Sequence, residues 1–488
     1  MLPDPFRVPV IVGVGEVNDR LTDGSAPQDS GQLMLAALAQ ANADAGGGWL
    51  ERCERILVIP QLSFSEIDIP SALSEGLGLD RAAVREADVP SGDTPVRLLN
   101  DAANAIGAGE VTACAVVGAE AMRTALRSGK PLFPNAAKSA SPLRRRYGLL
   151  QPAEVYPLYE NALRAAEGQS LAEGQAETGE ILSLMSEVAT GSEGAWLRQR
   201  KTPAEIIEAT ADNRPIAFPF TKLMVANASV NQGAAVIVTS LGAARAAGVP
   251  DERLIHIGAG AAAHEAHDAM ARAGWTTPPG MQVAIAETLS RNGLKAADID
   301  HIELYSCFPC VPKMARRELG WPAERPATVH GGLTFGGGPV ANYMTHAIAA
   351  MVRKLRSDGR TGFLFGNGGF CEHNHCIVLS RDALPGAVFP QDYDAQAIAD
   401  ARRGPVPALT DEIEGNFPVE TYTVLYDRDG APRHGVVLSR GPDGERIIAK
   451  VEPTDTVSLA FLTDGKVEPV GKSGSNRLSG NTLIWSAT

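Results

Sequence analysis

Thr328 to Tyr343, TVHGGLTFGGGPVANY, form a glycine-rich run that leads into a helical pattern continuing to residue 355. Gly337 and Gly338 let the backbone approach whatever lies opposite, and Pro339 presets φ for a first helical turn. Peptide N–H groups at such a helix start can receive an anion or a polarised carbonyl. The pattern therefore predicts either a ligand-binding loop or a tight strand-to-helix turn without a ligand.

The elements around this loop occur twice along the chain. In the first half, apolar strand patterns at 9–14, 55–60 and 113–118 alternate with helical patterns that follow Ser30 and span 96–107. In the second half, strand patterns at 253–259, 300–305 and 362–365 alternate with helical patterns from Gly280 and Tyr343. The alternation predicts an α/β layered domain with a mostly parallel sheet. The repeat predicts a duplicated fold with a pseudo-twofold axis. It also pairs the loop at 92–95 with the loop at 337–340, and we expect the two to face each other across one site.

Residues 124–220 interrupt the alternation with helical patterns at 156–167 and 171–190, which indicates an insertion that caps the site. Its basic run at 143–146 is open to two interpretations, a receptor for phosphates or a solvated face. After residue 385, a linker at 386–410 carries a helix-like segment at 391–402.

Residues 411–488 have a different composition, with Asp-Gly turn signals at 429–430, 443–444 and 464–465. Strand patterns are predicted at 421–426, 434–440, 446–451 and 457–462. They indicate a small antiparallel barrel or sandwich, OB-like in character. This segment carries 8 Lys and Arg against 12 Asp and Glu, a net charge of 8 − 12 = −4. Nucleic acid is therefore not the expected partner.

Charge and cysteine usage limit the classes of function. The formal net charge of −13 disfavours broad binding to nucleic acid or acidic membranes, although it leaves room for a local basic pocket. Six scattered cysteines fit a reducing compartment better than a disulfide framework. Without an apolar run of about 18 residues or a secretory signal pattern, we expect a cytoplasmic protein with no membrane span.

Five segments in the same order resemble the thiolase superfamily over roughly residues 5–385: 102–122, 230–238, 302–308, 331–339 and 366–369. The resemblance implies a five-layer αβαβα core. Residues 1–123 and 221–250 would form its first half, 124–220 an inserted loop domain and 251–385 its second half. Residues 411–488 would be the additional C-terminal β domain that some thiolase-like proteins carry. The resemblance further implies coenzyme A or acyl-CoA as substrate, no tightly bound cofactor, and acetyl-CoA acetyltransferase-like chemistry in lipid metabolism.

Three thiolase side chains are missing from their positions. Gly92 stands where the nucleophilic cysteine belongs, Gly338 replaces the histidine of the Gly-His-Pro turn, and the late catalytic cysteine falls at about Phe365. A thiolase cysteine is activated at a helix N-terminus and attacks the thioester. Ordinary thiolysis through an acyl-cysteine is therefore not expected.

The remaining candidate side chains follow the strand pattern at 300–305. Cys307 matches the acid/base cysteine of sterol-carrier-type thiolases, and Tyr305 matches the catalytic tyrosine of thiolase-fold steroid-CoA aldolases, although Ser306 lacks the acid found there. A small buried hydrophobe is the other interpretation of Cys307. His330 is the third candidate catalytic residue and is expected to line the pocket. Substrate and oxyanion contacts are predicted for Gly92, Asp93, Gly337, Gly338, Asn367, Gly368 and Gly369, and cofactor contacts for Ser229 and Asn231.

Two function hypotheses follow. The chain is an acyltransferase or a C–C bond forming or cleaving enzyme on acyl-CoA, including a retro-aldolase that uses Tyr305, or it is a non-catalytic acyl-CoA-binding or partner subunit. The sequence leaves two alternatives for a protein partner: a second copy of the chain in a homodimer, or another protein bound through the C-terminal domain. Residues 371–376, CEHNHC, invite a metal interpretation, but the sequence shows no remote partner to complete a tetrahedral set, so no metal is predicted.

Overall fold

The computed structural model describes residues 4–20, 26–131, 138 and 140–488. Residues 132–137 and 139 of the expected insertion lie outside the described residues. A nine-stranded sheet runs in the order β3-β2-β4-β7-β1-β8-β11-β10-β9. Its strands are β1 (Pro9–Asn18), β2 (Arg55–Val58), β3 (Val84–Glu86), β4 (Ala113–Ala121), β7 (Asn231–Ser240), β8 (Ile255–His264), β9 (His301–Leu304), β10 (Thr361–Gly368) and β11 (His373–Ser380).

The sheet confirms the predicted duplication. The run β2-β4-β7-β1 in the first half is repeated as β9-β10-β11-β8 in the second, with a parallel first pair and antiparallel pairs after it. The halves join where β1 pairs with β8 through only two registered positions, Val10 with His256 and Ile11 with Ile255. The expectation of a mostly parallel sheet was wrong. Only β2 with β3, β2 with β4, and β9 with β10 are parallel, because β1, β7, β8 and β11 run antiparallel to their neighbours.

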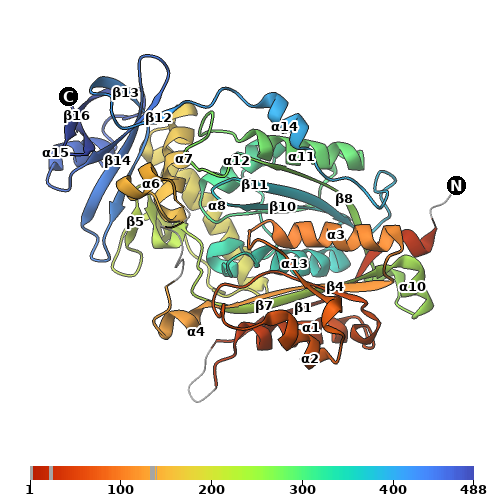
Figure 1. The fold of residues 1–488 in the computed structure, drawn as a ribbon. Coiled ribbons are helices and arrows are strands. Elements are labelled where there is room, and N and C mark those ends of the chain that lie inside the picture. The colour runs from red at the N-terminus through yellow and green to blue at the C-terminus, as the bar shows by residue number, and fades with distance from the viewer. Residues whose placement is uncertain (1–3, 21–25, 132–137, 139) are drawn as a thin grey trace.

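Helices complete five layers (Figure 1). The central layer holds α3 (Thr94–Ala108) and α13 (Tyr343–Ser357), which lie between the two halves of the sheet. The outer layers hold α1 (Ser30–Asp44) and α2 (Ile69–Leu77) on one side, and α11 (Pro279–Asn292) and α12 (Cys310–Leu319) on the other. Asp29, not Ser30, caps α1 through a capping box with Gln32. The short helix α10 (Leu241–Ala246) follows β7.

The insertion is mainly helical. It contains α4 (Met122–Arg127), α6 (Pro142–Tyr147), α7 (Pro152–Ala166), α8 (Leu171–Gly191) and α9 (Pro203–Ile207), followed by the short strands β5 (Pro215–Ala217) and β6 (Phe220–Thr221). In the basic run, Arg144 is buried and lies over the Phe370 ring at 4.7 Å, while Arg146 pairs with Asp411 of the C-terminal domain. Arg144 therefore does not lie on a solvated face, whereas Arg145 and Arg146 are exposed, and phosphate binding by the run stays a prediction.

The C-terminal domain is a closed barrel of β13 (Gly415–Tyr426), β14 (Pro432–Arg440), β15 (Arg446–Val451), β17 (Thr482–Ala487) and β16 (Ser473–Ser479), in that order around the ring. The strand order and the helix between the third and fourth strands match the OB-like prediction. The predicted strand at 457–462 was wrong: these residues form α15 (Thr456–Thr463), because Asp455 accepts hydrogen bonds from the Ser458 N–H and hydroxyl at the helix start.

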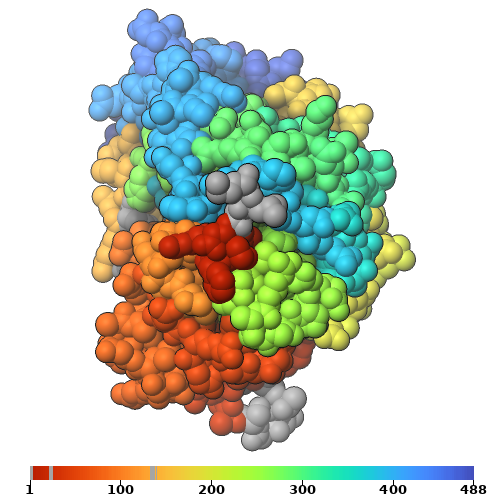
Figure 2. All heavy atoms as spheres, turned by 90° about the vertical axis from the view of Figure 1, so that its right-hand side faces the viewer, coloured from red at the N-terminus to blue at the C-terminus, as the bar shows by residue number. Residues whose placement is uncertain are grey.

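The barrel is fixed to the rest of the chain. Its β13 pairs with β5 of the insertion, and the buried Arg446 donates to the main-chain oxygens of Met270 and Arg272 at 2.7 and 2.9 Å. The linker, with α14 (Gln396–Arg402) and β12 (Leu409–Thr410), runs over the surface beside the N-terminal residues (Figure 2). Within the described residues, no helix is long and apolar enough to span a membrane.

Candidate functional site

Tyr305 fills the space in front of Gly92. Tyr305 follows the end of β9 and is 8% exposed, whereas Gly92 precedes α3. A Cβ atom added at Gly92 would lie 2.4 Å from Tyr305 Oη and 2.1 Å from the main-chain oxygen of Asn367. Real Cβ atoms do not approach that closely, so only glycine fits. The phenol therefore occupies the space that a side chain at residue 92 would need.

The late glycine loop closes the same site from the side of β10. A Cβ at Gly368 would lie 2.1 Å from Ser91 Oγ, and one at Gly366 would lie 3.0 Å from the Asp93 Cα. Ser91 Oγ donates to Asp93 Oδ1 at 2.5 Å, and both side chains are buried. The structure thus brings Gly92, Asp93 and the loop at 366–368 together with Tyr305. The side chain of Asn367 is already engaged, since its amide donates to Asn374 Oδ1 at 2.9 Å.

Tyr156 of α7 is a site residue that the sequence analysis missed. Its ring stacks on Phe308 with centroids 4.5 Å apart, and its hydroxyl oxygen accepts from the Cys371 N–H at 3.2 Å. The same hydroxyl lies 3.4 Å from Asn367 Oδ1 and contacts the Cys307 thiol. The insertion therefore contributes a polar contact to the floor of the site. A tyrosine within a helical pattern looks like core packing, so no sequence signal could have separated it.

Burial keeps the two candidate acid/base groups neutral. It raises the pKa of the Cys307 thiol to about 12, a shift that the Tyr156 hydrogen bond partly offsets. It also raises the pKa of Tyr305 well above its usual range, with smaller contributions in the same direction from Cys307 and Asp93. At neutral pH both groups therefore hold their protons, so they can donate a proton or a hydrogen bond, but they are weak bases.

Glu303 organises the loop on which the sequence analysis began. Its carboxylate accepts from the Thr328 hydroxyl, from the Val329 and His330 N–H groups, and from the Tyr343 hydroxyl at 2.7 Å. Burial raises the pKa of Glu303 to about 7, although these hydrogen bonds act against the shift. The loop continues as a π-helical turn at Gly332–Gly336, and α13 begins four residues after Pro339, so Pro339 does not occupy the first helical turn.

His330, Gly337 and Gly338 pack against residues other than Tyr305. His330 is fully buried, and its Nδ1 lies 3.1 Å from Ser192 Oγ. Gly337 adopts φ 99° against Gln232, and the Gly338 N–H donates to the Asn227 oxygen at 2.9 Å. Gly92 packs on Tyr305 and Gly338 on residues 226–227, so the expectation that the two loops face each other stays a prediction.

The two residues predicted to contact a cofactor lie at the start of β7: Ser229 precedes this strand and Asn231 is its first residue. Ser229 is exposed. Asn231 is fully buried, and its amide group is already engaged: it donates to Asp19 Oδ2 at 3.2 Å and to Thr124 Oγ1 at 2.9 Å, and it accepts from the Thr124 N–H. A ligand that reached Asn231 would have to displace these bonds. Cofactor binding at both residues stays a prediction.

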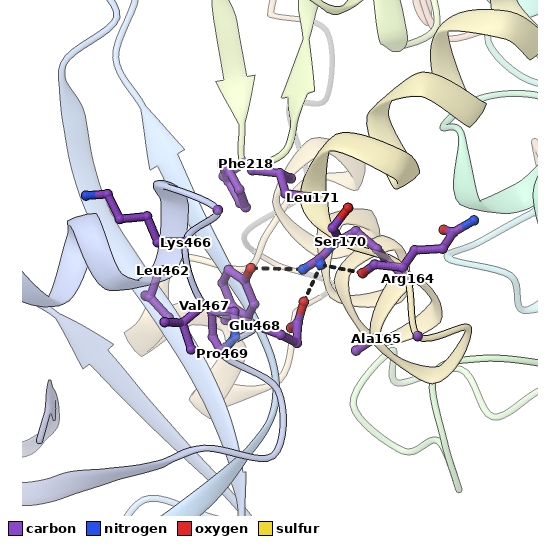
Figure 3. A pocket seen from close by; sticks show the side chains of 14 residues that line it. Arg164, Ala165, Ser170, Leu171, Phe218, Leu462, Lys466, Val467, Glu468 and Pro469 are labelled. Atoms are coloured by element: carbon purple, nitrogen blue, oxygen red, sulfur yellow. Dashed lines mark hydrogen bonds and ion pairs between the residues drawn. The ribbon is translucent and has the colours of Figure 1, made fainter.

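A separate hollow of about 310 Å³ lies at the seam between the insertion and the barrel (Figure 3). Arg164 reaches across it, pairs with Glu468 and donates to Tyr422 Oη at 3.2 Å. Within the described residues, Arg164 Nε has no hydrogen-bond partner, so the guanidinium is only partly paired where the insertion meets the barrel. None of the residues that surround Tyr305 lines the hollow.

Comparisons with known proteins agree with this architecture. Residues 398–480 match the family model of the thiolase-like protein type 1 additional C-terminal domain. No curated protein matches the sequence. Among solved structures, a monomeric SCP2-thiolase-like protein type 1 from Mycobacterium smegmatis is 29% identical with a TM-score of 0.84, and the match covers 100% of both chains.

More distant structures share the fold of the core. The Ltp2-ChsH2(DUF35) aldolase is 18% identical with a TM-score of 0.63, over 78% of this chain and 99% of that one. Human mitochondrial 3-ketoacyl-CoA thiolase in complex with CoA is 14% identical with a TM-score of 0.56, over 78% and 99% of the two chains. The duplicated five-layer core, together with the matched barrel, places this chain in the thiolase superfamily as a thiolase-like protein with an additional C-terminal domain.

Proposed function

We propose that the chain binds an acyl-CoA or a related thioester beside Tyr305 and acts on it without forming an acyl-cysteine. The observation that carries the proposal is the position of the Tyr305 phenol, which stands in front of Gly92 in the space that a side chain at residue 92 would need. The thiolase fold supports a thioester ligand, since a human thiolase of the same fold was solved with CoA.

In this proposal Tyr305 is the proton donor. Its raised pKa keeps the phenol protonated, so Oη–H can donate to an oxygen that becomes negative as a thioester enolate forms. The Cys307 thiol, also protonated, is the second donor. A donor placed at a developing enolate suits formation or cleavage of the C–C bond next to a thioester, and direct acyl transfer is the related alternative. An aldolase shares the fold, which is consistent with this reaction class.

A second candidate is a non-catalytic acyl-CoA-binding or partner subunit. It is favoured by the crowding at Gly92 and by the burial of Tyr305 and Cys307, each of which is only 8% exposed. Under this candidate the fold presents a ligand or the barrel to another protein, and Tyr305 is a packing residue.

The test compares turnover of a panel of β-hydroxyacyl-CoA and β-ketoacyl-CoA thioesters by the wild-type chain, Tyr305→Phe and Cys307→Ser. The matched control is Tyr426→Phe, because Tyr426 lies on β13 of the barrel. We expect Tyr305→Phe to reduce kcat by 10²- to 10⁴-fold, as loss of a general acid does, while the control is unchanged. Equal turnover by all four proteins would refute the role of Tyr305, and no turnover by the wild type would favour the non-catalytic candidate.

A further inference from the structure

Three buried metal-ligand side chains converge behind the glycine loop. Glu16 of β1, His330 of the loop and His346 of α13 each offer one ligand atom, and these atoms all lie within 4.8 Å of one another. Glu16 is 3% exposed at its side chain, and both histidines are fully buried. The residues come from both halves of the duplicated core, so the fold, and not a local motif, brings them together.

The two carboxylate oxygens of Glu16 have different neighbours. Oε1 lies 2.8 Å from His346 Nδ1 and 3.8 Å from His330 Nδ1, whereas Oε2 pairs with Arg353. In a tetrahedral zinc site with bonds of about 2.0–2.2 Å, ligand atoms lie roughly 3.4 Å apart. The two distances lie on either side of that spacing. All three ligand atoms lie within 4.8 Å of one another, so shifts of about 1 Å would bring them around one ion.

Several polar atoms in this cluster are without partners. Within the described residues, the buried Nε2 atoms of His330 and His346 have no hydrogen-bond partner. Ser192 Oγ, 3.1 Å from His330 Nδ1, adds a hydroxyl on the same side. Buried polar atoms are almost always paired in folded proteins. An ion held by the two Nδ1 atoms would leave these Nε2 atoms unpaired, so the positions of Nδ1 and of the Glu16 carboxylate are what favour an ion.

We propose that Glu16, His330 and His346 bind a divalent transition-metal ion of the Zn²⁺ class. Two imidazoles and one carboxylate are a donor set that such ions favour, and Ser192 or a water molecule would complete the shell. Arg353 pairs with the outer oxygen Oε2 of Glu16, which leaves Oε1 facing the two histidines. The ion would tie β1 of the first half to the glycine loop and α13 of the second.

Arg353 also stabilises the metal-free form of the site. Its guanidinium neutralises Glu16, and its side chain is 38% exposed, so it reaches from the buried carboxylate toward solvent. The metal ion and the guanidinium are both cations that interact with the Glu16 carboxylate, so each weakens the binding of the other. Removal of the guanidinium charge should tighten metal binding, a result that a purely structural ion pair would not produce.

A pair at the surface supplies the matched control. His264 and His373 stand opposite each other on β8 and β11 with their Nδ1 atoms 3.0 Å apart. The neighbouring Glu372 carboxylate approaches His373 from Nε2 at 3.5 Å, so these groups do not converge on one point. This pair includes a histidine of the CEHNHC segment, and it is the most obvious competing site for an added metal.

The experiment titrates the chelator-treated full-length protein with Zn²⁺ by calorimetry and with Co²⁺ by visible absorption. We expect one ion per chain and the intense absorption of four-coordinate Co²⁺. Glu16→Gln and His346→Ala should each weaken Zn²⁺ binding at least tenfold, Arg353→Met should tighten it, and His264→Ala should leave it unchanged.

Three results would overturn the proposal. They are the absence of stoichiometric Zn²⁺ uptake by the wild type, loss of uptake in His264→Ala, and weaker or unchanged uptake in Arg353→Met. Zn²⁺ uptake by the wild type, His264→Ala and Arg353→Met tests the proposal even if a substitution in the buried cluster prevents folding.

Discussion

Gly92→Ala should destabilise the protein strongly. The new Cβ would stand 2.1 Å from the main-chain oxygen of Asn367 and 2.4 Å from Tyr305 Oη, where an ordinary contact needs about 3.4 Å. The phenol can rotate, but the oxygen belongs to β10 and is held by the sheet. Overpacking of a rigid neighbour costs typically about 1–3 kcal/mol, and we expect the upper end, about 3 kcal/mol. Gly92→Cys, which restores the thiolase nucleophile, should lose at least as much.

Urea unfolding measures this change as a shift of the midpoint at constant slope. Gly274→Ala is the matched control, because a Cβ at Gly274 meets nothing within 4 Å and φ there lies outside the left-handed region. The control should stay within about 0.5 kcal/mol of the wild type. In a double-mutant cycle with Tyr305→Ala, which itself leaves a cavity, Gly92→Ala should cost less than in the wild type but more than nothing, since the Asn367 oxygen remains. If Gly92→Ala proved as stable as the control, the crowding at this site would be refuted.

Three further predictions follow from buried polar groups. Tyr156→Phe removes the hydroxyl that receives the Cys371 N–H, so we expect a loss of about 0.5–1.5 kcal/mol in urea unfolding, and no change would show that the bond is not formed. Burial raises the pKa of Glu120 from 4.5 to about 7, so the folded state holds the proton more tightly. The free energy of unfolding should therefore fall by about 3 kcal/mol as pH rises from 4.5 to 7 and stay constant above pH 7. Thermal melts across this pH range measure the change, and Glu120→Gln should not show it. Arg446→Met leaves Glu420 with Arg440 as its remaining partner and removes the bonds to the Met270 and Arg272 oxygens, so it should cost up to about 3 kcal/mol, measured by denaturation; a neutral result would mean that the barrel is held by other contacts.

Much of the core could be predicted from the sequence because its elements carry redundant signals. Apolar runs closed by glycine marked β1, β4 and β10, and helical periodicity marked α1, α3, α11 and α13. Strand direction could not be predicted, since an apolar run reads the same whether its neighbour is parallel or antiparallel. The segment at 457–462 failed for a related reason, because a six-residue apolar run fits a strand or a helix and only the cap at Asp455 decides it.

The candidate site was predicted in part. Tyr305 and Gly92 were singled out by comparison with a family pattern, but their mutual contact depends on the path of β10 and could not be foreseen. Tyr156 was missed, and His346 was not singled out as a candidate. Glu16 carried no motif at all. These three residues are remote in sequence from the groups they contact, and only the packing of α7, β1 and α13 brings them into place.

The proposed function requires a thioester to bind beside Tyr305 without covalent attachment. Mass spectrometry of the protein incubated with acetyl-CoA tests this binding, with native spectra for the complex and denaturing spectra for any adduct. We expect a one-to-one complex under native conditions and the unmodified mass after denaturation. A stable acetyl adduct, or no complex at millimolar acetyl-CoA, would contradict it.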